Sequence, residues 1–112
     1  MERAYICCPL SGDIEGNIKK AIAYAKYVFY RCEMVPIVPH FYSYIFDENN
    51  PEERVYALTC DLENLLSLHD VWVFGDHETE GMKYELSKFR PLNRNIHRVT
   101  DEQCEEILKV YG

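Results

Sequence analysis

The sequence predicts an α/β protein, in which a small parallel sheet of about four strands is covered by helices. Three short apolar segments support this prediction, and each is followed, directly or after a loop, by a stretch with helical spacing: residues 4–9, 34–38 and 70–75. Strands that alternate with helices form right-handed βαβ units, and buried parallel strands are apolar almost throughout. The length of 112 residues and the hydrophobic content of 47% fit one folded domain over residues 1–112.

The first half of the chain is expected to form a strand, a helix and a second strand. The strand at residues 4–9 ends at proline, and Ser11-Gly12-Asp13 predicts a turn. A helix is expected from about Gly16-Asn17 to Cys32, because apolar residues recur every three or four positions. Its predicted buried stripe is Ile18, Ile22, Ala25, Phe29 and Cys32. The strand at residues 34–38 stops at Pro39, and residues 40–46 form an aromatic-rich connection.

The second half continues the alternation with three more helices and two strands. Asn50 as the capping residue and Pro51 at the first helical position predict a helix start. The predicted buried stripe of this helix is Val55, Leu58, Leu62 and Leu65. After the strand at residues 70–75, a helix at residues 81–89 is expected to bury Met82, Leu86 and Phe89. Residues 95–99 are expected to form a fourth strand, and Thr100-Asp101 begins a last helix whose apolar residues are Cys104, Ile107, Leu108 and Tyr111.

Composition narrows the class of protein. The net charge of −7 and the lack of a Lys/Arg stripe argue against binding of DNA or RNA. The five cysteines show no paired ligand spacing for zinc, so we expect reduced thiols in a reducing compartment. No signal peptide and no apolar run of membrane-spanning length is present, which predicts a cytoplasmic protein without membrane partners.

Candidate functional residues follow the strands at one edge of the predicted sheet. Ligands of open α/β sheets bind just beyond the carboxyl ends of the strands. Glu85 lies three residues after Met82, at the border of the buried stripe of its helix, and Asp61 has the same placement on the preceding helix. Two partly buried carboxylates suit glycosyl chemistry, in which one attacks a sugar C1 while the other handles a proton.

Each of these residues also has a purely structural interpretation. Glu85 can be a solvated surface acid, and Asp61 can form a salt bridge with Arg54 or Lys83. His40 after a proline is often a hydrogen-bonded turn residue, and Tyr5 can pack within its strand. Spacing alone therefore predicts a pocket and leaves the reaction open.

Several motifs together resemble the DUF4406 family of small phage and bacterial proteins, within the nucleoside 2-deoxyribosyltransferase-like superfamily. They are Tyr5-Ile-Cys-Cys-Pro-Leu-Ser-Gly with Asn17, Pro39-His40, Glu53-Arg54, Asp61-Leu62, Asp70-Val-Trp-Val-Phe-Gly75, and Glu80-Gly81-Met82 with Glu85. The resemblance implies a flavodoxin/Rossmann-like three-layer fold and a location in a bacterium or a phage-infected host cell. It implies Glu85 as nucleophile on the sugar C1, Asp61 as proton-handling partner and Tyr5 as the residue that orients Glu85. The implied contacts to sugar or phosphate are Pro9, Ser11, Gly12, Asn17, His40, Thr79, Gly81 and Met82, and neither a metal nor an organic cofactor is implied.

Two departures from the pattern of this superfamily bear on function. The transferases place an acid six residues before the nucleophile, where this chain has Thr79, which favours a nucleotide ligand. Residues 87–91 replace the usual small-residue stretch after the nucleophile. The sequence therefore predicts a nucleoside or nucleotide N-glycosidase or 2-deoxyribosyltransferase.

Two alternatives to this enzyme stay open. One is a binder, with or without degradation, of a nucleotide or an ADP-ribose-type signal, such as a phage counter-defence protein. The other is a structural subunit without activity. In each case the small sheet and the many aromatic residues predict a homo-oligomer.

Overall fold

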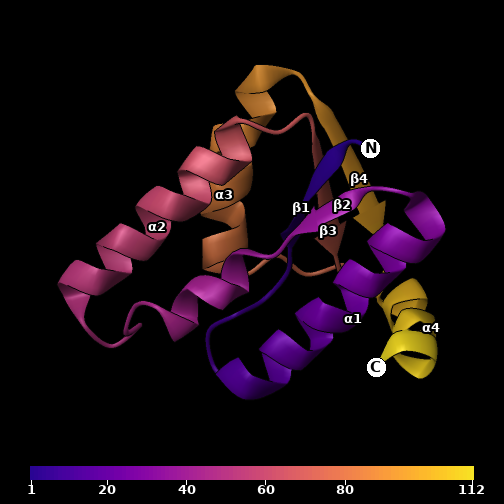
Figure 1. The fold of residues 1–112 in the computed structure, drawn as a ribbon, viewed down its shortest axis with the longest axis horizontal. Coiled ribbons are helices and arrows are strands. Elements are labelled where there is room, and N and C mark those ends of the chain that lie inside the picture. The colour runs from indigo at the N-terminus through magenta and orange to yellow at the C-terminus, as the bar shows by residue number, and fades with distance from the viewer.

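The structure, a computed structural model that describes residues 1–112, contains one four-stranded sheet in which all neighbouring strands are parallel (Figure 1). The strands lie in the order β2-β1-β3-β4. The elements in chain order are β1 (Arg3–Cys7), α1 (Ile14–Cys32), β2 (Val35–Ile37), the 3₁₀ helix η1 (Pro39–Tyr44), α2 (Pro51–Leu66), β3 (Asp70–Phe74), α3 (Glu80–Phe89), the 3₁₀ helix η2 (Arg90–Leu92), β4 (Asn95–Val99) and α4 (Asp101–Tyr111). The predicted α/β class and four-stranded parallel sheet are confirmed.

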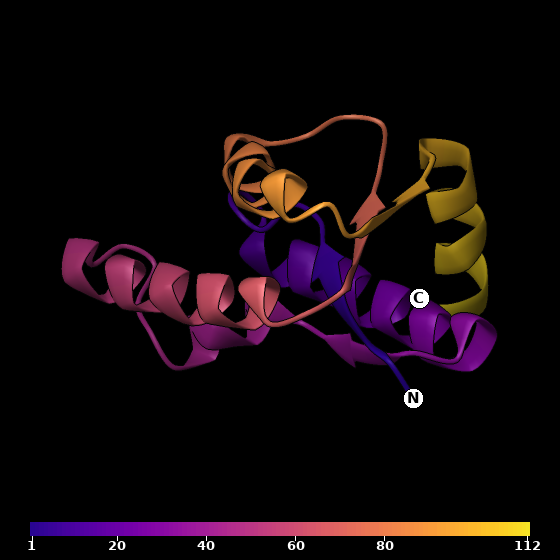
Figure 2. The ribbon, with the colours of Figure 1, turned by 90° about the horizontal axis from the view of Figure 1, so that it is seen from above.

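Each face of the sheet has its own apolar core. On one face α1 and α4 pack over Ala4 and Ile6 of β1, and on the other α2 and α3 pack over Tyr5 and Cys7. Successive side chains of a strand point to opposite faces, which explains the alternation along β1. Figures 1 and 2 show α1 beside α4 and α2 beside α3, so the sheet is the middle of three layers.

Side-chain caps fix the starts of all four helices. Asp13, Asn50, Thr79 and Thr100 each accept a hydrogen bond from a backbone N–H of the first helical turn. Such a cap satisfies a donor that has no acceptor within the helix. The cap at Asp13 starts α1 at Ile14, two residues before the predicted start. The predicted bounds of β4 and the predicted start of α4 match the structure.

The predicted buried stripes of α1 and α2 are partly wrong. Ile22 and Phe29 are exposed to 36% and 43%, whereas Ala21 and Val28 are buried. The face of α1 that packs on the sheet is thus rotated from the predicted one and includes Ala21, Ala25 and Val28. Val55 is exposed because the first half of α2 extends beyond the sheet, away from α4 (Figure 2). The stripe of α3 is buried as predicted.

Residues 39–44 form the 3₁₀ helix η1, within the segment that the sequence analysis described only as an aromatic-rich connection. All five cysteines are free thiols, and Cys8 and Cys7 belong to the apolar cores on opposite faces of the sheet. None of the helices is long and apolar enough to cross a membrane.

Candidate active site

A cavity of about 350 Å³ lies beyond the carboxyl end of β1, on the face of the sheet covered by α2 and α3. The loop after β1, the helix η1, α2 and the first turns of α3 form its walls. Sheets with this strand order bind ligands beside the first strand, where the chain reverses the direction in which it adds strands. The cavity therefore lies where the topology predicts a ligand.

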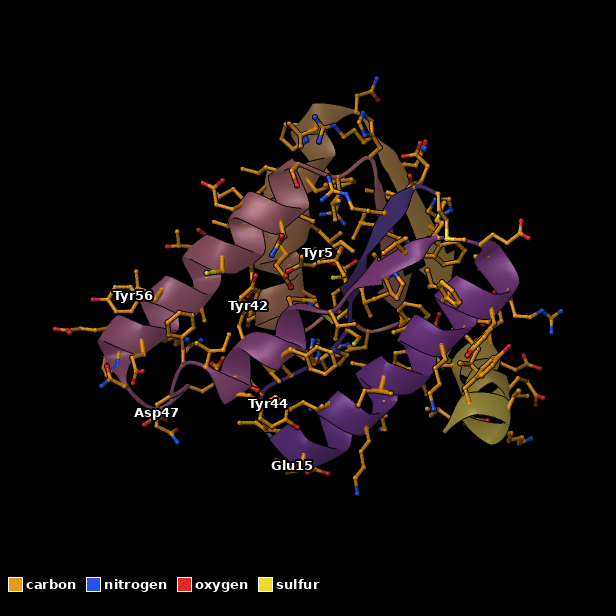
Figure 3. The ribbon with its side chains drawn as sticks, viewed as in Figure 1. Tyr5, Glu15, Tyr42, Tyr44, Asp47 and Tyr56 are labelled. Atoms are coloured by element: carbon orange, nitrogen blue, oxygen red, sulfur yellow. The ribbon has the colours of Figure 1, made fainter.

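Glu85 lines this cavity, and Tyr5 contacts Glu85 from β1. Tyr5 is fully buried, and its hydroxyl donates a hydrogen bond to Oε2 of Glu85. Figure 3 shows Tyr5 near the middle of the molecule, whereas Tyr44 and Tyr56 lie at its periphery. Burial raises the pKa of Glu85 to about 7, and the hydrogen bond from Tyr5 opposes this rise. Burial and the Glu85 charge raise the pKa of Tyr5, so its hydroxyl remains a donor.

Asp61 faces the same cavity from α2. Burial raises its pKa to about 8, and the negative charges of Glu85 and Glu48 add to this rise. Its Oδ1 is buried without a hydrogen-bond partner, an arrangement that costs about 1–3 kcal/mol. The salt bridge considered for Asp61 is not formed, since Lys83 instead pairs with Glu80 at 3.6 Å and Arg54 has no ion-pair partner. Burial and the neighbouring negative charges thus favour a protonated Asp61 beside an ionised Glu85.

His40 closes the η1 side of the cavity and is only 3% exposed. Its Nε2 lies 2.9 Å from the carbonyl oxygen of Pro9 and 3.4 Å from Sγ of Cys8. Burial lowers the pKa of His40, so the ring is neutral. Because a carbonyl only accepts hydrogen bonds, we assign the single ring proton to Nε2. Nδ1 is then an unprotonated acceptor, and it is buried without a partner.

The remaining predicted contact residues separate into two groups. Ser11, Thr79, Gly81 and Met82 line the same cavity as Glu85. Pro9 and Asn17 line an adjoining cavity of about 240 Å³ on the other side of Cys8 and Thr79, while Gly12 lines neither. The Asn17 amide donates to the carbonyl oxygens of Leu10 and Ser11, so it holds the first loop in place.

The loop between β3 and α3 is also held in place. Glu78 accepts ion-pair contacts from Arg98 at 3.0 Å and from Arg90 at 3.6 Å. The next residue, Thr79, caps α3 through its hydroxyl, which accepts a hydrogen bond from the N–H of Met82. A Cβ at Gly81 would meet only the Thr79 hydroxyl, at 4.0 Å, so a ligand has free space to approach this turn. No group of three or more His, Cys, Asp and Glu side chains is arranged to hold a metal ion.

A model of a family described as a domain of unknown function, DUF7768, matches residues 2–99. The chain belongs to this family. The family that matches is therefore not DUF4406, whose motifs the sequence resembles, and that part of the prediction was too specific. A comparison with curated proteins found no match.

Among solved structures, this DUF7768 chain is similar to a 2-deoxyribosyltransferase from the psychrotolerant bacterium Bacillus psychrosaccharolyticus. That protein is described as a biocatalyst for the synthesis of antiviral and antitumoral nucleosides. The TM-score is 0.68, with 17% sequence identity over 88% of this chain and 72% of that one. At this level of identity the likeness establishes a shared fold.

The DUF7768 chain also has cavity residues that the sequence analysis did not assign to the site. Four residues of α2 at helical spacing line the cavity: Arg54, Ala57, Leu58 and Asp61. The sequence analysis singled out Asp61 and treated Arg54 only as its ion-pair partner, although both share one helix face. Glu48 precedes α2 in a loop, and no pattern in the sequence marks it.

Proposed function

We propose that this protein cleaves the N-glycosidic bond of a nucleoside or nucleotide, either by hydrolysis or by transfer of the 2-deoxyribosyl group to another base. The observation that supports this most is the pairing in one cavity of Glu85, bound by the Tyr5 hydroxyl, with Asp61. The unequal environments of the two carboxyls favour one ionised group and one protonated group near neutral pH.

The first step separates the base from the sugar. An oxygen of the Glu85 carboxylate forms a bond to C1 of the sugar while the bond from C1 to the base nitrogen breaks. The electron pair of that bond goes to the base, and Asp61 donates its proton to a base nitrogen, so the base leaves neutral. Tyr5 holds the other Glu85 oxygen and fixes the direction of attack.

The second step regenerates the enzyme. Asp61, now ionised, accepts a proton from water or from an incoming base, which attacks C1 as the ester bond to Glu85 breaks. Both carboxyls return to their initial protonation states. Water as acceptor gives hydrolysis, and a second base gives transfer.

A binder that leaves its ligand intact is the second candidate, and Thr79 is the observation that favours it. This residue takes the position of the acid in the transferases that the sequence resembles, and its hydroxyl already serves as the cap of α3. The binder would use the same cavity. It differs from the enzyme in the fate of the glycosidic bond.

The test is base release by the wild type and by Glu85→Gln. Each protein is incubated with a panel of nucleosides, 2-deoxynucleosides and their 5′-monophosphates, and free base is measured by chromatography. We expect the wild type to release base from at least one member and Glu85→Gln to be slower by at least about 10³-fold, because no nucleophile remains. Glu105→Gln on the exposed face of α4 is the matched control and keeps full activity.

Thermal unfolding of both variants checks that each is folded. Base release by folded Glu85→Gln at the wild-type rate would contradict the proposed nucleophile. Recovery of intact ligand from the wild type, with a thermal shift on binding, would instead support the binder.

A further inference from the structure

Two buried side-chain atoms in this chain have no hydrogen-bond partner, and both belong to residues of the candidate cavity. They are Nδ1 of His40 and Oδ1 of Asp61. Buried polar groups in proteins are almost always hydrogen-bonded, so each exception needs an explanation. Both residues line one cavity, so a ligand that enters it and displaces the side chains covering these two atoms can supply the missing partners.

The two residues lie on the same side of the cavity. His40 belongs to η1, which packs against α2, the helix of Asp61. A hydrogen bond from the Asn64 amide of α2 to the Tyr42 hydroxyl of η1 fixes this contact at 2.9 Å. Glu85 belongs to α3, so it lines the cavity from a different helix than His40 and Asp61.

The two residues offer opposite hydrogen-bonding roles. The carbonyl oxygen of Pro9 accepts a hydrogen bond from the Nε2–H of His40. The Nδ1 atom of the neutral ring can therefore only accept a hydrogen bond. Asp61 keeps its proton near neutral pH because it is partly buried beside Glu85, and its hydroxyl can donate. A base that satisfies both must present an N–H donor next to a ring-nitrogen acceptor.

We infer that the cavity selects a base with an exocyclic amino group beside a ring nitrogen, with the amino group donating to His40 Nδ1 and the ring nitrogen accepting from Asp61. This inference rests on the proposed function and names its substrate class. Adenine presents this pair as N6 and N7, whereas a 6-oxo purine presents two acceptors. The 6-oxygen of such a purine would face Nδ1 of His40, and both atoms are acceptors whose lone pairs repel. We therefore expect 6-oxo purines to bind and react poorly.

The test compares 2′-deoxyadenosine 5′-monophosphate with 2′-deoxyinosine 5′-monophosphate, which differ in the 6-substituent and in the protonation of N1. The variant is His40→Gln, whose side-chain amide can still donate to Pro9 but has no acceptor at the Nδ1 position. His69→Gln is the matched control, because His69 is exposed and lines neither cavity. Dissociation constants are measured on proteins that also carry Glu85→Gln, and kcat/KM on proteins that keep Glu85.

We expect the adenine nucleotide to be favoured at least ten-fold in binding by proteins with His40, and also by those with His69→Gln. His40→Gln should reduce this ratio to near one, by weakening the adenine nucleotide. Equal affinity for the two nucleotides, an unchanged ratio in His40→Gln, or no binding of either nucleotide would overturn the inference. A base preference without turnover would leave the inference standing and reject the enzymatic function.

Nitrogen-15 NMR of the wild-type protein with labelled histidine gives a second readout. It needs no variant, so it does not depend on whether His40→Gln folds. Binding of the adenine nucleotide should move the Nδ1 resonance of His40 and leave Nε2 nearly unchanged. A purely structural His40 would show no change at Nδ1, and that result would also overturn the inference.

Discussion

Two aspartates, Asp70 buried at one end of the sheet and Asp61 partly buried at the other, show how differently the same side chain is used. Asp70 begins β3 at the amino end and is 4% exposed. Its Oδ1 accepts hydrogen bonds from His97 at 2.8 Å and from Asn95 at 3.3 Å. Asp61 faces the cavity at the carboxyl end, and its Oδ1 accepts none. The partners of Asp70 come from the neighbouring strand β4, so they are built into the sheet.

The difference separates a structural carboxyl from a reactive one. A carboxylate with two hydrogen-bond partners stabilises the fold. A carboxyl without partners costs stability, but it can exchange a proton with whatever enters the cavity. The predictions below test whether this division between the two ends of the sheet is real.

The largest effect is expected for Asp61→Asn. The amide cannot donate a proton to the leaving base or accept one from water, so kcat should fall by about 10²- to 10⁴-fold while the protein remains folded. Base release under single-turnover conditions measures the loss. Asp70→Asn is the control at the other end of the sheet, and equal losses in the two variants would contradict the division.

Asp70→Ala is expected to affect stability. It removes the acceptor of two hydrogen bonds and leaves His97 and Asn95 without their partner, at a cost of about 2–4 kcal/mol of unfolding free energy. Urea unfolding measures this difference, and Asp70→Asn, which keeps an acceptor, should lose less. Activity per folded molecule should be unchanged, and a selective loss of kcat would show that Asp70 also acts on the site.

Tyr5→Phe removes the hydroxyl that donates a hydrogen bond to Glu85. Oδ1 of Asp61 has no such donor. With Glu85 acting ionised and Asp61 protonated, kcat/KM should follow a bell-shaped curve with limbs near pH 7 and pH 8. Without the Tyr5 hydroxyl the pKa of Glu85 rises, so the acidic limb moves to higher pH and the maximum falls by about ten-fold. Rates measured from pH 5 to 10 give the curve. An acidic limb that does not move would contradict the role of Tyr5.

The smallest effect concerns stability at alkaline pH. The pKa of Asp61 is raised from 3.8 to about 8 on folding, so ionisation opposes folding, and the wild type loses stability as pH rises through this range. Asp61→Asn avoids this loss and should exceed the wild type by about 1–2 kcal/mol at pH 9, with a smaller difference at pH 5. Thermal unfolding at the two pH values measures it. A wild type that is more stable than the variant at pH 9 would show that Asp61 has a partner in solution.

The sequence predicted those parts of the fold whose signals are local. Thr100, with a glutamine three residues later, forms a capping box, and the predicted start of α4 was correct. The stripe of α3 was correct because Met82, Leu86 and Phe89 are large and evenly spaced. The stripe of α1 was partly wrong because the face of the helix that packs on the sheet, which includes Ala21, is set by tertiary packing.

Much the same limit applies to the site. Glu85 and Asp61 could be singled out by their spacing, and the structure brings them into one cavity. The missing partners of His40 and Asp61 depend on every neighbouring side chain, so no spacing could reveal them. Asn17 illustrates the reverse case, since its amide is occupied by the backbone of the first loop.

The chain has a single tryptophan, and its surroundings make it a spectroscopic probe of one end of the molecule. The indole of Trp72 stacks on His97 at 4.3 Å and donates to the sulfur of Met34, and it lines neither cavity. Its fluorescence should therefore change when the strands separate on unfolding. Filling of the cavity should leave the emission nearly constant, so unfolding and ligand binding can be followed independently in the same cuvette.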